Sequence, residues 1–239
     1  MIRISQSCKP VALTLILVCG LTSSVFAASK PHAVSFGKWI TVQWSPDNGA
    51  ANEKRVALKV RPLLIDMRVK EFTVDAAHDV TDRLFVVRRA FRVNDSLPQE
   101  SASAPHWRWQ RGAWLLVDRA TGHVSAINLP EFDVFYSAVS WYRDYAAYCG
   151  ISDDGKKVYA VVAQISRRKP ILKKPLGEGL GGSEPTNVSS DSVCLIPAWQ
   201  RSPTRVTFEA NGTPQQIFAI HGRSVDLVTE EEDDEEAAK

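Results

Sequence analysis

Short runs of β-branched and aromatic residues recur along this chain of 239 residues, separated by residues typical of turns, mainly Gly, Asp, Asn and Pro. No stretch places apolar residues at the i, i+3, i+4 and i+7 spacing of an amphipathic helix between recognisable caps. The pattern therefore predicts an all-β fold. The predicted strands cover residues 34–44, 55–60, 69–74, 84–93, 113–118, 123–128, 138–142, 145–150, 157–164, 193–198, 205–209, 216–220 and 224–228.

Two hairpins are the clearest local features of the sequence. In the first, Asp118 and Gly122 bracket a tight reversal, and Gly122 can adopt the left-handed backbone conformation that such a turn needs. In the second, the pair Asp154-Gly155 lies between two apolar runs, which is a strong short-range signal for a hairpin.

The region from Trp114 to Gln164 contains a strand that ends in Asp-x-x-Thr-Gly, a return strand, and a Ser-Asp-Asp-Gly-Lys-Lys turn before a strand rich in Tyr and Val. This pattern resembles blades of TolB-like and WD-like β-propellers. The resemblance implies propeller-like repeated antiparallel sheets that act as a binding scaffold, and it carries over no catalytic residues. At about 40 residues per blade, residues 28–239 have room for about five blades. A β-sandwich is the alternative fold.

The first 27 residues have the layout of a cleavable export signal. Arg3 and Lys9 supply a positive start, residues 11–21 form an apolar run, and Val25-Phe26-Ala27 ends the segment with small residues two apart. The apolar run is shorter than the roughly 20 residues of a membrane-spanning helix. We therefore expect cleavage after Ala27 and a periplasmic or extracellular location without a transmembrane span. An uncleaved N-terminal anchor is the alternative.

Cleavage at this point removes two of the four cysteines, Cys8 and Cys19, and leaves Cys149 and Cys194. Two cysteines in an oxidising compartment predict one disulfide. The sequence has no CxxC pair and no Cys/His cluster at zinc spacing, so we expect no metal site.

Charge divides the rest of the chain into a body and a tail. Residues 28–239 hold 27 basic and 27 acidic residues, but residues 230–236 are all acidic, which leaves a basic excess in the body. We expect one β-rich domain at 28–229, with a mobile loop at 169–192 that is rich in Pro and Gly. The tail at 230–239 is predicted to be disordered and to compete with anionic partners for basic groups of the body.

The basic run from residue 167 to 174 is the first candidate binding site. Its five positive charges could hold phosphate or carboxylate groups, and a solvated loop explains the same composition. The charges belong to Arg167, Arg168, Lys169, Lys173 and Lys174.

The second candidate site is formed by Trp107 and Trp109. On a strand these two side chains project from one face while Arg108 projects from the other. Paired indoles on an exposed face would provide a platform for sugar rings or for an arginine. Packing in the core is the alternative explanation.

Catalysis has weaker support in the sequence. His78 lies among Asp75, Asp79 and Asp82, but a polar turn explains such a group. The chain has no Gly-x-Ser-x-Gly elbow, no His-Glu-x-x-His motif and no Gly-rich phosphate loop after a strand. We therefore assign no catalytic residue and expect no cofactor.

These features favour an exported binding or structural module of the cell envelope that recognises an anionic or carbohydrate ligand. The expected partners are an envelope protein, an acidic polysaccharide or anionic lipid head groups, and export argues against nucleic acid. The competing class is an envelope hydrolase or carbohydrate-active enzyme whose site is assembled from distant strands. A pocket that gathers carboxylates or His78 would favour the enzyme, and a flat aromatic or basic face would favour the binding module.

Overall fold

The computed structural model describes residues 32–44, 56–94, 96, 107–178, 194–210, 213–222 and 224–228. Every regular element in these ranges is a β-strand, so the prediction of an all-β fold is confirmed for them. The predicted export signal and the acidic tail lie outside these ranges. Within them, no helix is long and apolar enough to cross a membrane.

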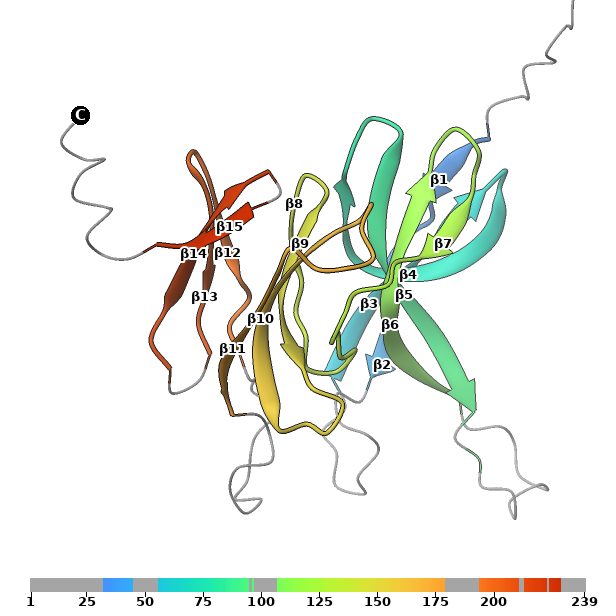
Figure 1. The fold of residues 1–239 in the computed structure, drawn as a ribbon. Coiled ribbons are helices and arrows are strands. Elements are labelled where there is room, and N and C mark those ends of the chain that lie inside the picture. Colours follow the sequence, from blue (N-terminus) through green and yellow to red (C-terminus); the bar gives the residue numbers. More distant parts are fainter. Residues whose placement is uncertain are drawn as a thin grey trace, which may run out of the picture. The chain divides into compact units, whose positions relative to one another are not determined.

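The strands form three sheets, which Figure 1 colours in chain order from blue to red. The first sheet contains β1 (Val34–Phe36), β2 (Ile40–Trp44), β3 (Val56–Ile65), β4 (Arg68–Asp79), β5 (Leu84–Asn94), β6 (Trp107–Asp118) and β7 (Val124–Ala126). The second sheet contains β8 (Ser140–Tyr142), β9 (Tyr145–Ile151), β10 (Lys157–Gln164) and β11 (Leu172–Glu178). The third contains β12 (Ala198–Arg201), β13 (Thr204–Phe208), β14 (Gln216–His221) and β15 (Ser224–Leu227).

Five strands of the first sheet pair in a closed circuit. Strands β2 to β6 pair antiparallel in chain order, and β6 returns to β2 through the parallel pairing of Trp44 with Trp109. A buried cluster of five side chains lies on the face that carries this pair, with Val42, Phe72 and Trp109 packed against it. Its members are Trp44, Leu58, Val60, Val74 and Ala90.

Three antiparallel meanders of four strands follow one another along the chain: β4–β7, β8–β11 and β12–β15. Both hairpins predicted from the sequence are confirmed within them. The amide of Gly122 donates to the carbonyl of Asp118 at 2.8 Å between β6 and β7, and Gly122 has a φ of +64°. Gly155, in the turn between β9 and β10, has a φ of +70°.

Some predicted strand boundaries were wrong. The predicted strand 34–44 is divided into β1 and β2, and β6 begins at Trp107, six residues before its predicted start. The larger error concerns the predicted mobile loop 169–192, because residues 172–178 form strand β11 on the edge of the second sheet. Residues 179–193 lie outside the described part of the chain.

The second sheet has buried side chains on both faces. Neighbouring residues of β9 point to opposite faces, so Ala147 and Cys149 join a cluster with the third sheet, while Ala146 and Tyr148 join a cluster with the first. The same alternation divides β10. This double burial explains why both strands are almost continuously apolar in sequence.

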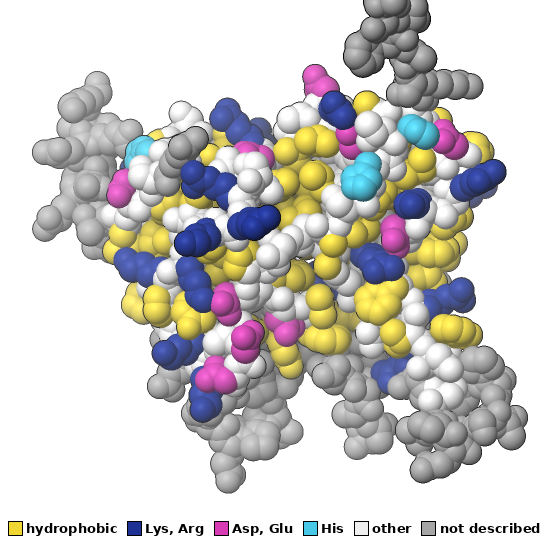
Figure 2. Space-filling model, turned by 45° about the vertical axis from the view of Figure 1, so that its right-hand side comes forward, with side chains coloured by type: hydrophobic (Ala, Val, Ile, Leu, Met, Phe, Trp, Pro, Cys, Tyr) yellow, Lys and Arg dark blue, Asp and Glu magenta, His cyan; other side chains and the backbone are white. Residues whose placement is uncertain are grey.

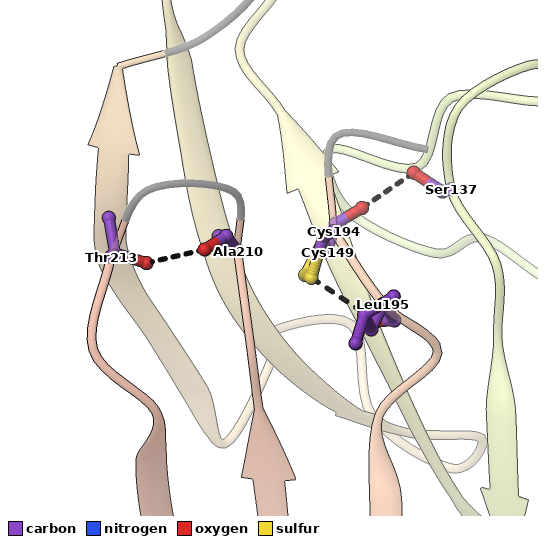
Figure 3. The surroundings of a disulfide bond; sticks show 6 residues. All are labelled: Ser137, Cys149, Cys194, Leu195, Ala210 and Thr213. Atoms are coloured by element: carbon purple, nitrogen blue, oxygen red, sulfur yellow. Dashed lines mark hydrogen bonds between the residues drawn. A yellow bond between two sulfur atoms is a disulfide. The ribbon is translucent and has the colours of Figure 1, made fainter. Parts of the chain in front are cut away.

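The predicted disulfide between Cys149 and Cys194 is present (Figure 3), with the two Cα atoms 6.2 Å apart. It joins β9 to the segment that leads into the third sheet, where Cys194 forms an isolated bridge with Ala210. The hydroxyl of Ser137 donates to the carbonyl of Cys149 at 2.7 Å on the side of the first sheet. A disulfide is compatible with an exported protein.

Gly150 of β9 is required by a close approach of the segment before β8. A Cβ atom at this position would lie 2.8 Å from Cβ of Glu131 and 3.0 Å from Cγ2 of Val161. We expect Gly150→Ala to lower the free energy of unfolding by about 1–3 kcal/mol, because a side chain in a filled site forces its neighbours apart. Urea denaturation followed by circular dichroism measures this loss.

Gly155 provides the control for this substitution. A Cβ atom there meets no heavy atom within 4 Å, so Gly155→Ala should cost only the strain of its left-handed φ, about 1 kcal/mol. A larger loss for Gly155→Ala than for Gly150→Ala would contradict the close approach at Gly150.

Candidate arginine–tryptophan surface

One face of the first sheet carries interleaved arginine and tryptophan side chains. Trp107, Trp109 and Arg111 alternate along β6 and therefore share a face, and Arg92 of β5 is the cross-strand partner of Trp109. Trp44 of β2 lies beside Trp109 through the parallel pairing. We call these five residues the arginine–tryptophan surface.

Arg92 lies close to both tryptophans that were singled out in the sequence. Its guanidinium carbon is 5.5 Å from the ring centroid of Trp107 and 5.6 Å from that of Trp109. Both distances fall within the range of cation–π attraction. Arg92 is exposed, and no carboxylate of the described residues forms an ion pair with it.

The two tryptophans differ in their surroundings. Trp109 packs edge-on against Phe72, with ring centroids 5.3 Å apart, and belongs to the margin of the buried cluster. Trp107 is 56% exposed. The packing explanation therefore applies to Trp109, while Trp107 presents its indole to solvent.

Arg111 and Trp44 extend the surface along β6 and β2. The guanidinium carbon of Arg111 lies 4.5 Å from the ring centroid of Trp44. Nε of Arg111 and Nε1 of Trp44 are both buried, and neither has a hydrogen-bond partner among the residues that the structure describes. Both atoms can only donate, so this end of the surface has a surplus of donors over acceptors.

A second positive charge is buried beside the surface. Arg88 of β5 is 5% exposed, and its guanidinium donates to the carbonyls of Val134 and Gly112. Burial, followed by repulsion from Arg111, lowers the pKa of Arg88 to about 10, so the group stays protonated at neutral pH. The positive charge of Arg88 therefore adds to the potential around Arg111.

Sequence reasoning did not distinguish the adjacent arginines Arg88 and Arg89 of β5. Arg89 is exposed and forms an ion pair with Glu71 at 3.0 Å, whereas Arg88 points to the interior. Sequence reasoning also missed the partnership of Arg92 with Trp107. The only sequence signal for this contact was the alternation of Trp and Arg along residues 107–111. That alternation does not show which strand pairs with β6.

The basic run 167–174 is divided by the fold. Arg167, Arg168 and Lys169 lie between β10 and β11, while Lys173 and Lys174 are neighbours on β11 and point to opposite faces. Figure 2 shows Lys and Arg side chains in small groups spread over the face in view, with apolar and acidic side chains between them.

The two lysines of β11 already have partners. Nζ of Lys173 donates to Oε1 of Glu131, and this hydrogen bond raises the pKa of Lys173. Nζ of Lys174 lies 5.6 Å from the ring centroid of Phe218 in the third sheet. The other three charges, those of Arg167, Arg168 and Lys169, form no ion pair or ring contact with another residue that the structure describes.

The acids near His78 in sequence do not assemble around its ring. Nε2 of His78 donates to the carbonyl of Arg143 at 2.8 Å, and the ring stacks on Trp141. Asp79 forms an ion pair with Arg119 instead. In the described ranges, no group of His, Cys, Asp and Glu side chains could hold a metal ion.

No family model, curated protein or solved structure matches this chain. The function is therefore inferred from the side chains themselves. Within the described ranges, the arginine–tryptophan surface places the exposed ring of Trp107 beside Arg92, which has no ion-pair partner there, on neighbouring strands of one sheet.

Proposed function

We propose that this protein is an exported binding module of the cell envelope that recognises an acidic carbohydrate at the arginine–tryptophan surface. The observation that carries the proposal is the position of Arg92 beside the exposed ring of Trp107, with no carboxylate partner among the described residues. An indole face suits the C–H groups of a sugar ring, and a guanidinium suits a carboxylate. A uronic acid oligosaccharide carries both groups on one residue.

Export is part of the same proposal. The layout of residues 1–27 supports it, and so does the disulfide between Cys149 and Cys194. We propose further that the three consecutive meanders form a blade-like scaffold with its ligand site on the first sheet. No observation on the described side chains favours the hydrolase, because His78 contacts the carbonyl of Arg143 and Asp79 forms an ion pair with Arg119.

Calorimetric titration with an oligogalacturonate, and with its reduced neutral counterpart, tests the proposal. We expect Trp107→Ala and Arg92→Gln each to weaken binding of the acidic sugar about tenfold, which corresponds to about 1.4 kcal/mol. Arg92→Gln should in addition reduce the dependence of affinity on salt, because it removes a charge from the site.

Trp39→Ala is the matched control, since Trp39 is 45% exposed and also stacks on an arginine, with Arg61 at 4.4 Å. This variant should bind the acidic sugar as the wild type does. Wild-type affinity in both the Trp107 and the Arg92 variants would disprove a role for the arginine–tryptophan surface.

A further inference from the structure

The hairpin between β3 and β4 ends in two exposed apolar side chains. Met67 in the turn is 80% exposed, and Val69 at the start of β4 is 56% exposed. Single exposed apolar side chains are ordinary on a protein surface. Two of them at the tip of one hairpin form a small apolar projection.

The backbone at this tip is in a costly conformation. Asp66 and Met67 both have positive φ values, 51° and 65°, in a turn of the kind that favours Asn and Gly. A left-handed conformation costs a residue with a side chain about 1–2 kcal/mol. Asp66 is held there, because its carboxylate accepts from the amide of Ala33 at 3.0 Å and contacts His32 at 2.6 Å. Met67 is 80% exposed, so packing of its side chain does little to offset the strain.

Two exposed basic residues flank the apolar side chains of the tip. Arg68 and Lys70 are exposed and alternate with Met67 and Val69 along the chain, and neither forms an ion pair with any other described residue. The two nearest acids in sequence are engaged, since Asp66 contacts His32 and Glu71 pairs with Arg89. The tip therefore presents two apolar groups flanked by two exposed cations, which form no ion pair within the described part of the chain.

We propose that this hairpin tip inserts into the surface of an anionic lipid bilayer. Met67 and Val69 would enter the boundary between head groups and acyl chains, while Arg68 and Lys70 would bind lipid phosphates. Charge complementarity and size both favour a bilayer over a protein, because a specific protein interface buries far more surface than two side chains on a turn provide. The proposal is independent of sugar binding, which uses a different part of the first sheet.

Co-sedimentation of the protein, as recovered from cells, with lipid vesicles tests this inference. We expect binding to vesicles that contain phosphatidylglycerol and much weaker binding to vesicles of phosphatidylcholine alone. Arg68→Gln/Lys70→Gln should weaken binding to the anionic vesicles by about fivefold per charge. All variants keep the same N-terminal residues, so any contribution of the apolar run 11–21 is common to them.

Met67→Gly separates the role of the tip in binding from its role in folding. Glycine tolerates the left-handed conformation, so this variant should be at least as stable as the wild type. Its binding to anionic vesicles should nevertheless fall severalfold, and Met67→Asp/Val69→Asp should abolish binding. Leu195→Asp/Ile196→Asp is the control, because these two side chains are similarly exposed, at 55% and 65%, and lie elsewhere in the fold.

Trp107→Ala should bind vesicles normally, which distinguishes this test from the test of sugar binding. If the wild type does not bind anionic vesicles, or if Met67→Gly and Met67→Asp/Val69→Asp bind them as well as the wild type does, the hairpin tip is not a lipid-binding element.

Discussion

Removal of the Cys149–Cys194 disulfide should lower the free energy of unfolding by about 3–4 kcal/mol. The bond closes a loop across a sequence separation of 45 residues, and its Cα separation of 6.2 Å lies within the normal range for a disulfide. Closing this loop lowers the conformational entropy of the unfolded chain. Both cysteines also belong to the buried cluster between the second and third sheets. Urea denaturation of the oxidised wild type and of Cys149→Ala/Cys194→Ala measures the difference.

Reduced wild-type protein is the necessary control, because it keeps both sulfur atoms in the core. The decrease in the free energy of unfolding on reduction isolates the effect of the covalent bond. Any further decrease in the alanine variant measures the loss of packing by the two sulfur atoms. A difference below about 1 kcal/mol between oxidised and reduced protein would show that the bond does not constrain the unfolded chain as the loop-entropy estimate requires.

Phe208→Ala should destabilise the protein by a similar or larger amount, about 3–5 kcal/mol. Phe208 is fully buried, its ring packs edge-on against Phe218 at 5.8 Å, and its cluster includes residues of β9 and β10. Truncation would leave a cavity between the two sheets. Urea denaturation measures the loss, and hydrogen exchange in β9 and β10 should become faster because these strands line the cavity.

Leu227→Ala in the same sheet is the control for this core substitution. Leu227 is 42% exposed, so its truncation should change stability by about 0.5 kcal/mol or less. Equal losses for Phe208→Ala and Leu227→Ala would contradict a shared core between the second and third sheets.

Local turn chemistry made the two hairpins predictable. Gly122 and Gly155 adopt positive φ values that other residues rarely take, and each lies between apolar runs in the sequence. The disulfide was also predictable, because the proposed export signal left only Cys149 and Cys194 to pair. The hairpin inference depends on residues adjacent in the chain, and the disulfide inference depends on the number of cysteines that remain. Neither needs knowledge of the tertiary contacts.

Strand β11 could not be predicted because its sequence resembles a loop. Pro175 lacks an amide hydrogen, and Gly177 has no side chain to pack on a sheet. In the structure β11 is an edge strand, and its register shifts between the partners Val158 and Tyr159. An edge position and an irregular register tolerate a proline, so the strand depends on β10 and not on its own propensity.

The sequence by itself determined the all-β class, the two hairpins, the disulfide and the common face of Trp107 and Trp109. Only the tertiary structure decided which arginine contacts those rings. The pairing of β5 with β6 places Arg92 beside them, whereas Arg88 points inward and donates to the carbonyl of Val134. Adjacent arginines have the same chemistry in a sequence. Strand register and the segments packed on each face give one of them a buried role and leave the other exposed, and those contacts join residues far apart in the chain.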